Sequence, residues 1–219
     1  MNSKKNKIVK NRQKSSTPNS TKLKNYADKE IKFLSQDQLE RLFQVVRAAD
    51  KARDIALFHI GYFCGLRASE VGLLQYDDWM DRANSLYIRR LKRSENVSVI
   101  LDQARTNILK RFLKGGDFDS VYSPLFPSRG GTRGLSRYRV HQLMVEYATK
   151  AKLPKDKRHF HVLRHSIAVH MLDSGADIAD VRRHLGHRSV AVTYIYAKYT
   201  RRRQAYLHQI INNSRFIAR

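Results

Sequence analysis

Apolar residues recur at helical spacing over much of the chain, and capping residues mark where several helices begin. Ser35 can form a capping box with Gln38, which predicts a helix over residues 36–49. Its apolar positions, three and four residues apart, are Leu39, Leu42, Phe43 and Val46. The apolar run over residues 55–66 predicts a second, more deeply buried helix that ends near Gly65, since glycine favours the left-handed cap conformation.

Further along the chain the same signals predict mostly helix with one small sheet. Capping residues and apolar spacing indicate helices over residues 103–114, 136–152, 161–175, 177–186 and 189–199. Two short β-favouring runs, 85–90 and 96–101, flank a basic turn and predict an antiparallel hairpin. The segment 115–134 is rich in Gly, Pro and Ser and is expected to be a loop. The predicted fold class is therefore mostly α with a small antiparallel β-sheet.

The charge changes this picture from an ordinary helical domain to one that binds a polyanion. The 219 residues include 43 Lys and Arg against 19 Asp and Glu, a formal net charge of +24. Residues 1–25 carry eight basic and no acidic side chains and few apolar ones, which predicts a disordered basic arm before a folded body at residues 26–219. A merely solubilising surface or a lipid-binding surface is an alternative, but nucleic acid fits the charge best.

Several other classes of protein are disfavoured by the sequence. No apolar run reaches about 18 residues and the amino terminus is charged, so neither a membrane span nor a secretory signal is expected and the cytoplasm is the expected location. The single cysteine, Cys64, allows no internal disulfide and no cysteine-based zinc site. No phosphate-binding glycine loop and no carboxylate cluster for magnesium is present, so no cofactor is expected.

Three local patterns could carry chemistry. In GLRASE, Arg67 follows the end of an apolar helix, and Glu70 lies one turn away and could pair with it. In HVLRH, His161 and Arg164 share a helix face, where they could hold a phosphate and pass a proton. His165 lies four residues after His161, which also fits a metal pair, but no carboxylate or cysteine completes that ligand set.

The third pattern, HLGHRSVAVTYIYAKY, places His187 before three tyrosines. Tyr194 and Tyr196 lie about 200° apart on an α-helix, so they cannot both face one pocket. Tyr199 completes the set, and a tyrosine stripe of this kind is usually core packing. His184 forms a further His-x-x-His pair without acidic ligands and is interpreted as structural.

Together and in this order, the three patterns resemble the catalytic domain of the tyrosine recombinase family, also called the phage integrase family, over roughly residues 32–212. GLRASE is similar to the family's first arginine box, HVLRH to its His-x-x-Arg box and LGHRSVAVTYIY to its last box. The family's nucleophile lies nine residues after the histidine, at Tyr196 here, and its hairpin lysine matches Lys92. No separate core-binding domain is expected before this region, and in that respect the chain resembles the short fimbrial phase-variation recombinases.

The resemblance implies a mechanism and assigns a role to each matching residue. Tyr196 would attack a DNA phosphodiester, form a 3′-phosphotyrosyl bond and release a 5′-hydroxyl. His161 would accept a proton, Lys92 would protonate the leaving oxygen, and His187 would donate a hydrogen bond. Arg67 and Arg164 would hold the non-bridging oxygens. The implied catalytic set is Arg67, Lys92, His161, Arg164, His187 and Tyr196.

The resemblance also implies partners: double-stranded DNA, a homotetramer in the DNA synapse and accessory DNA-bending proteins. The apolar residues near 200–219 would dock on a neighbouring subunit or pack on their own domain. Two alternatives stay open, a type IB topoisomerase-like nicking and resealing enzyme and a non-catalytic DNA-binding protein. Neither the target sequence nor the choice among inversion, integration, excision and resolution can be predicted from these residues.

Overall fold

The computed structural model describes residues 30–91, 94–116 and 118–200, together with Ala205, His208, Gln209 and Ile211. The α-helices are α2 (Gln36–Ala48), α3 (Ala52–Phe63), α4 (Ala68–Val71), α5 (Gln103–Lys114), α6 (Arg137–Lys150), α7 (His161–Asp173), α8 (Ile178–Leu185) and α9 (Val190–Ala197). The strands are β1 (Trp79–Met80), β2 (Ser85–Ile88) and β3 (Val97–Ile100). Three single-turn 3₁₀ helices complete the described elements: η1 (Tyr76–Asp78), η2 (Asp81–Ala83) and η3 (Lys155–Lys157). The expected arm at residues 1–25, Lys92 and most of residues 201–219 lie outside the described residues.

The predicted helix starts are confirmed by side chains that cap backbone N–H groups. Ser35 accepts from the N–H of Gln38 and the Gln38 side chain accepts from the N–H of Ser35, so the capping box is complete. Ser136, Asp177 and Ser189 each accept one backbone N–H at the start of α6, α8 and α9. These contacts satisfy donors that helix geometry leaves unpaired, which fixes where each helix begins.

The predicted hairpin is present, and a third strand extends it. Antiparallel β2 and β3 pair Leu86 with Val99, and β1 adds to the other edge of β2 in the order β1-β2-β3. The third strand was not predicted, because a two-residue strand is too short to show alternation. The four-residue α4 was missed for the same reason. Three expected helices end two residues early, at Lys150, Asp173 and Ala197.

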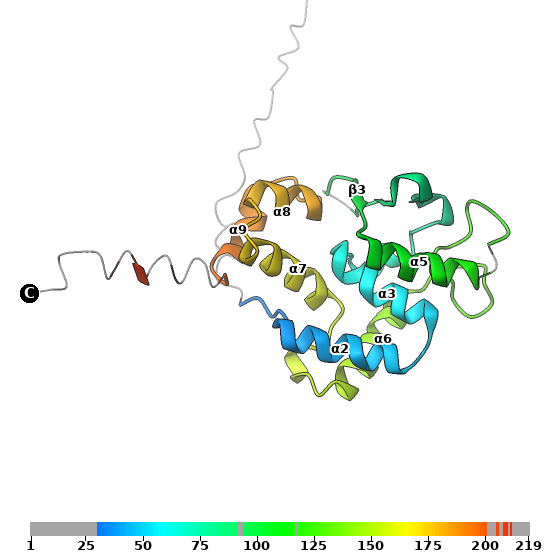
Figure 1. Cartoon of the computed structure of the whole chain (residues 1–219), viewed down its shortest axis with the longest axis horizontal. Helices are drawn as coiled ribbons and strands as arrows, with labels where there is room; N and C mark the ends of the chain where they lie inside the picture. The colour runs from blue at the N-terminus through cyan, green and yellow to red at the C-terminus, as the bar shows by residue number, and fades with distance from the viewer. Residues whose placement is uncertain are drawn as a thin grey trace, which may run out of the picture.

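The core forms around α3, which packs against α2, α5 and α7 (Figure 1). Its residues Leu57, Phe58 and Ile60 are fully buried, which explains why this stretch is apolar on nearly all sides. Figure 1 also shows α7, α8 and α9 grouped together, with β3 close to α8. This grouping brings two distant sequence patterns, HVLRH and HLGHRS, to one place.

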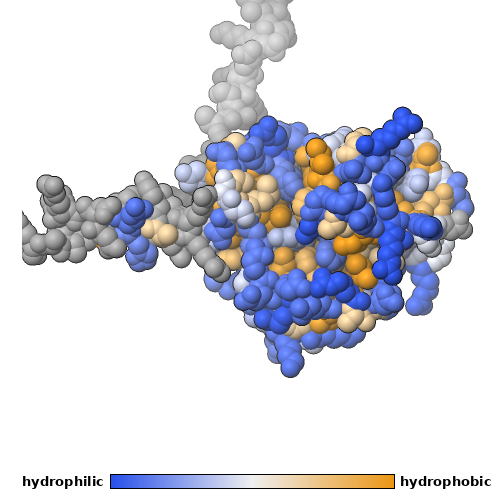
Figure 2. Space-filling view, viewed as in Figure 1, coloured by the Kyte–Doolittle hydropathy of each residue, from blue (hydrophilic) through white to orange (hydrophobic). Residues whose placement is uncertain are grey.

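The face in Figure 2 is predominantly hydrophilic, with apolar patches between charged side chains. None of the helices within the described ranges is long and apolar enough to span a bilayer.

Candidate active site

The predicted site residues come from four separate segments that the fold joins. Arg67 is the residue directly before α4, and Arg164 lies in the second turn of α7. His187 lies between α8 and α9, and Tyr196 lies near the end of α9. Because α7 packs against α3, α8 and α9, these side chains gather around one region of the molecule. Lys92 lies outside the described residues, so its place in the site stays a prediction.

A buried carboxylate holds two of the arginines. Arg67 Nη1 donates to Glu70 Oε1 at 2.5 Å, and Arg90 Nη1 donates to Glu70 Oε2 at 2.8 Å. The side chains of Glu70 and Arg90 are both fully buried. Arg90 also donates to the carbonyl oxygens of Cys64 and Gly65. Sequence reasoning anticipated the Arg67–Glu70 pair and missed Arg90, whose burial could not be read from a basic turn.

Arg164 adds a third guanidinium to this cluster. The residue is 1% exposed, and it donates to the carbonyl oxygens of Gly65 at 2.6 Å and Leu185 at 2.7 Å. Burial, together with the positive charges of Arg90 and Arg67, lowers its pKa to about 9. Three guanidiniums around one carboxylate leave an excess of positive charge withdrawn from water. Such an arrangement favours binding of an anion.

Tyr196 faces the cluster and is buried. The residue is 2% exposed, and its hydroxyl lies 3.0 Å from Nδ1 of His165. Burial raises its pKa to about 12, against the opposing charges of Arg164 and Arg67. The His187 ring lies parallel to the Tyr196 ring, 6.5 Å between centroids. A neutral phenol at this place needs a proton acceptor before it can act as a nucleophile.

His187 is fixed from both sides. Its Nδ1 hydrogen-bonds Thr193 Oγ1 at 2.9 Å, and burial with the charges of Arg164, Arg67 and Arg90 lowers its pKa to about 3. On the other side, Ser94 forms a backbone bridge with His187. The Ser94 hydroxyl in turn accepts from Arg67 Nη2 at 3.1 Å. The end of the β2–β3 turn is thus bonded to the site.

His161 lies at the entrance of the site, at the first position of α7, where the residue keeps an exposed surface. Partial burial of its ring and the charges of Arg164 and Arg67 lower its pKa to about 4. It packs edge-to-face on His165, 4.4 Å between centroids. Sequence reasoning considered His165 only as a metal ligand and so missed its contact with Tyr196. A helical i, i+4 count from His161 was the only signal for it.

The other tyrosines and His184 lie in different surroundings. Tyr194 is 65% exposed, which confirms that it points away from Tyr196. The Tyr199 hydroxyl accepts from the N–H of Ile31 at 2.8 Å and its ring packs edge-to-face on Phe33, so it ties the amino-terminal segment to the body. His184 Nε2 lies 2.8 Å from the carbonyl oxygen of Phe63, consistent with a structural role.

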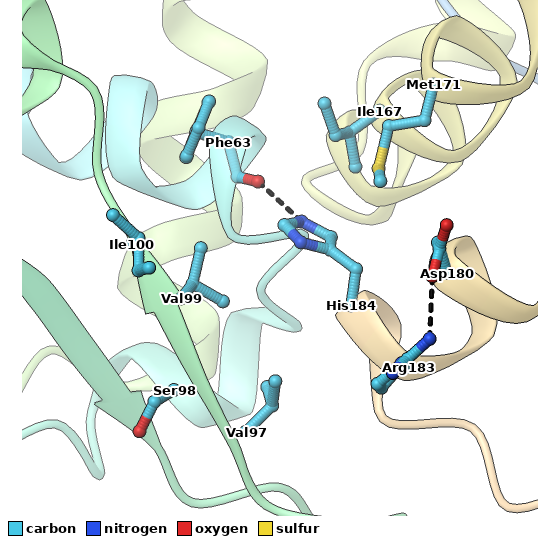
Figure 3. A pocket seen from close by; sticks show the side chains of 10 residues that line it. All are labelled: Phe63, Val97, Ser98, Val99, Ile100, Ile167, Met171, Asp180, Arg183 and His184. Carbon is cyan, nitrogen blue, oxygen red and sulfur yellow. Dashed lines mark hydrogen bonds and ion pairs between the residues drawn. The ribbon is translucent and has the colours of Figure 1, made fainter. Parts of the chain in front are cut away.

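An apolar pocket of about 400 Å³ lies beside β3, on the side of α7 that carries Ile167 and Met171 (Figure 3). The His184 ring lies between these two residues and Val99 (Figure 3). Asp180 and Arg183, which form an ion pair, also line the pocket. His165 and Ile167 lie about 200° apart around α7. The pocket is therefore separate from the arginine cluster and Tyr196.

Comparison with known proteins identifies the family of the chain. The model of the "Phage integrase family" matches residues 32–203. The chain is 35% identical to the tyrosine recombinase XerD of Caulobacter vibrioides over 75% of its length and 32% identical to XerA of Pyrococcus furiosus over 77%. It covers 56% and 58% of those two proteins, so it spans little more than half the length of these relatives.

Solved structures show the same fold. The crystal structure of XerA recombinase superposes with a TM-score of 0.70 and 26% identity, covering 86% of this chain and 66% of that one. The post-cleavage complex of XerH site-specific recombinase with a palindromic difH substrate gives a TM-score of 0.72 at 22% identity, covering 85% and 55%. The catalytic domain of bacteriophage HP1 integrase gives 0.58 at 20%, covering 85% and 97%. With its family match, its relatives and its fold in agreement, the chain belongs to the phage integrase family of tyrosine recombinases.

Proposed function

We propose that this chain acts as a site-specific DNA recombinase in which Tyr196 cuts and rejoins DNA strands. Its phenol oxygen attacks a backbone phosphorus, giving a 3′-phosphotyrosyl bond and a free 5′-hydroxyl. The observation that carries the proposal is a buried tyrosine whose phenol lies in the field of Arg164 and Arg67, in a cluster where Glu70 pairs with both Arg67 and Arg90. Since one phosphoester replaces another, the bond energy is retained and the reverse reaction rejoins the strand.

The arginines are suited to the charge that develops in the reaction. As phosphorus becomes five-coordinate, negative charge grows on its non-bridging oxygens, and fixed cationic donors stabilise that charge more than the ground state. Arg67 is partly exposed and held by Glu70, so it can present N–H groups to a phosphate. Arg164 is oriented by two carbonyl oxygens, and a guanidinium carries more donors than these two bonds use. His187 serves as a further hydrogen-bond donor.

We assign Lys92 as the general acid that protonates the leaving 5′-oxygen. The support comes from its described neighbours in the chain. The N–H of Leu91 donates to Glu70 Oε1 at 3.4 Å, and Ser94 Oγ accepts from Arg67. The residues on both sides of the turn thus contact the proposed phosphate site.

Double-stranded DNA is the proposed substrate, in keeping with the net charge of +24 and with the DNA-bound state of XerH. The exposed start of α6 adds basic side chains beside the site. Gly72, just after α4, packs so closely on this segment that a Cβ there would lie 2.5 Å from the carbonyl oxygen of Leu135. Exposed basic residues of the segment are Arg133, Arg137 and Arg139. They can contact the phosphates next to the one that reacts.

The proposal extends to assembly. Exchange between two DNA sites needs four strand cuts, so a homotetramer is the proposed active form, with residues 200–219 docking between subunits and residues 1–25 acting as a basic arm on DNA. Inversion of a DNA segment, or integration and excision of a mobile element, is the proposed outcome in the cytoplasm, with DNA-bending proteins as accessory partners. Pairing two defined sites distinguishes this enzyme from a topoisomerase, which reseals the strand that it cuts.

The nucleophile is tested by covalent trapping. A pool of nicked duplexes of random sequence is incubated with the protein, and DNA that stays attached after denaturation is isolated and sequenced. We expect wild type to form this adduct and Tyr196→Phe to bind the same duplexes without forming it, because the attacking oxygen is gone.

Two matched variants act as controls. Tyr194→Phe removes an exposed hydroxyl and should leave the yield of adduct unchanged. Tyr199→Phe removes the acceptor of the Ile31 N–H and should lower the thermal midpoint while the adduct persists. An adduct formed by Tyr196→Phe and lost in either control would reassign the nucleophile.

A further inference from the structure

The hydroxyl of Tyr196 contacts His165, a residue without a role in the mechanism above. Nδ1 of His165 and Oη of Tyr196 are 3.0 Å apart, within hydrogen-bond range, and the ring centroids are 5.6 Å apart at 52°. The two residues sit on α7 and α9, which pack against each other, so the contact is set by helix packing. His161, in contrast, packs edge-to-face on His165 and keeps an exposed surface.

We propose that His165 is the catalytic base for Tyr196: its Nδ1 accepts the phenol proton as Oη attacks phosphorus. This inference rests on the proposed function and refines it. It leaves His161 to face the phosphate together with Arg67 and Arg164. A candidate base must first lie within reach of the proton that it takes, and His165 meets this condition in the described structure.

The step balances without any further reactant. A bond forms between Tyr196 Oη and phosphorus, and the bond from phosphorus to the 5′-oxygen breaks with its electron pair on that oxygen. The phenol proton moves to Nδ1 of His165, and the leaving oxygen takes a proton from the general acid, proposed to be Lys92. On rejoining, the 5′-hydroxyl returns its proton to the general acid as its oxygen attacks phosphorus. The bond from phosphorus to Tyr196 Oη breaks, and Oη takes back the proton held on His165.

The protonation state of His165 suits an acceptor. Burial, with the charges of His161, His159, Arg164 and His187, lowers its pKa to about 3, so the ring is neutral near pH 7. In the tautomer with the single ring proton on Nε2, Nδ1 carries a lone pair that accepts from the phenol. Binding of a phosphodiester brings a negative charge into the cluster, which raises the pKa of His165 and strengthens it as a base when substrate is present.

Around His165, the groups that titrate or carry charge come from two parts of the fold. His159, His161 and Arg164 belong to α7 and the residues just before it, and His187 and Tyr196 belong to the segment that ends in α9. A pH profile of cleavage therefore reports on this set. Variants at His161 and His165 separate the contributions of the two candidate proton acceptors on α7.

The test is His165→Asn compared with His161→Asn. Asparagine keeps a hydrogen-bonding group near the place of Nδ1 but cannot accept a proton at neutral pH. The probe is the duplex most enriched by covalent trapping with wild type, and the readout is the single-turnover rate of adduct formation as a function of pH. Thermal midpoints show whether each variant is folded.

We expect His165→Asn to lose about 100-fold or more in rate, the usual contribution of a positioned base. The rate of adduct formation by wild type should stop rising with pH once the His165 ring is neutral. The variant rate should instead keep rising with pH towards the pKa of the phenol, about 12. His161→Asn should lower the rate but keep the wild-type shape of the profile. In His165→Ala, added imidazole should restore part of the rate, because a free base can fill the space.

Some outcomes would overturn the inference. If His165→Asn cleaves within a few-fold of wild type with the same pH profile, His165 only packs against the nucleophile. If the rate of His161→Asn no longer follows the wild-type pH dependence while that of His165→Asn does, the base is His161. A folded His165→Ala that imidazole does not rescue also counts against proton transfer. Absence of any adduct with wild type is a different result, since it contradicts the proposed function itself.

Discussion

At the scale of single residues, Glu70 organises the site. It is fully buried and accepts from Arg67, from Arg90 and from the N–H groups of Arg67 and Leu91. Burial alone would raise its pKa, but the charge of Arg90, the backbone N–H of Arg67 and the charges of Arg164 and Arg67 outweigh burial and hold the pKa below its usual range. A carboxylate in this position neutralises part of a cationic cluster while it fixes the direction of two guanidiniums.

Glu70→Gln should therefore destabilise the fold more than a similar change on the surface. Breaking a buried ion pair leaves uncompensated charge, at a cost of about 3 to 5 kcal/mol in the free energy of unfolding. The matched control is Glu146→Gln, which removes an exposed ion pair with Lys150 and should cost about 0.5 kcal/mol or less. Equal unfolding free energies for the two variants in urea would contradict a structural role for Glu70.

The loss of unfolding free energy caused by Glu70→Gln should become smaller at acid pH. A carboxyl whose pKa is lower in the folded than in the unfolded state stabilises the fold above its usual pKa, and this contribution is lost as pH falls through the folded value. The stability gap between wild type and variant should thus be constant from neutral pH down to the usual value of 4.5 and shrink below it. Urea unfolding at several pH values measures the gap. A gap that widens in acid would contradict this assignment.

The contacts of individual site residues were partly predictable from the sequence. Helical geometry alone separated Tyr194 from Tyr196, and burial confirms that only the second faces inward. The pairing of Arg67 with Glu70 also followed from spacing. Arg90 and His165 were not predictable in their roles, because each depends on a contact between segments far apart in the sequence.

At the scale of elements, the turn between β2 and β3 is held against the segment between α8 and α9. The N–H of Glu95 donates to the carbonyl oxygen of Gly186 at 2.9 Å, and Ser94 bridges His187. Gly186 has φ +68°, and a Cβ there would lie 2.3 Å from the carbonyl oxygen of Glu95. Only glycine allows both the left-handed backbone and this close approach. The contact brings Ser94 and Glu95 next to Gly186 and His187.

Gly186→Ala should separate these two elements and slow cleavage. The left-handed conformation costs a residue with a Cβ about 1 to 2 kcal/mol, and the clash with backbone adds to this cost. Gly131→Ala is the control, since Gly131 has φ +78° but no atom within 4 Å of the added Cβ. We expect both variants to lose stability in thermal unfolding, and only Gly186→Ala to lose adduct formation. Similar adduct yields for both would mean that the docked turn is not needed.

The elements predicted from the sequence are those with strong local signals. Capping side chains at Ser35, Ser136 and Asp177 fixed the starts of three helices within a residue. Helix ends were less accurate, since several lack a strong stop signal and depend on packing. The strand β1 and the helix α4 exist through tertiary contacts with β2 and with the start of α6. Elements this short have no periodicity to read.

At the scale of the whole molecule, charge is distributed unevenly along the chain. Residues 1–25 carry eight positive charges and residues 26–219 carry the other +16, with no Asp or Glu after Asp180. Within the described residues, the site itself has more guanidiniums than carboxylates. A polyanion relieves the self-repulsion of such a chain, so binding and stability should be coupled.

The contribution of the amino-terminal charges can be measured from the salt dependence of DNA binding. Each phosphate contact adds about −0.9 to the slope of log affinity against log salt, so loss of all eight contacts would flatten the slope by about 7. We expect deletion of residues 1–25, and a full-length variant with Gln at the eight basic positions, to flatten the slope equally on one duplex. A flatter slope after deletion but not after the Gln changes would mean that the segment acts through something other than charge. An unchanged slope in both variants would place all of the phosphate contacts in residues 26–219, where the arginines of the site and of α6 would have to supply them.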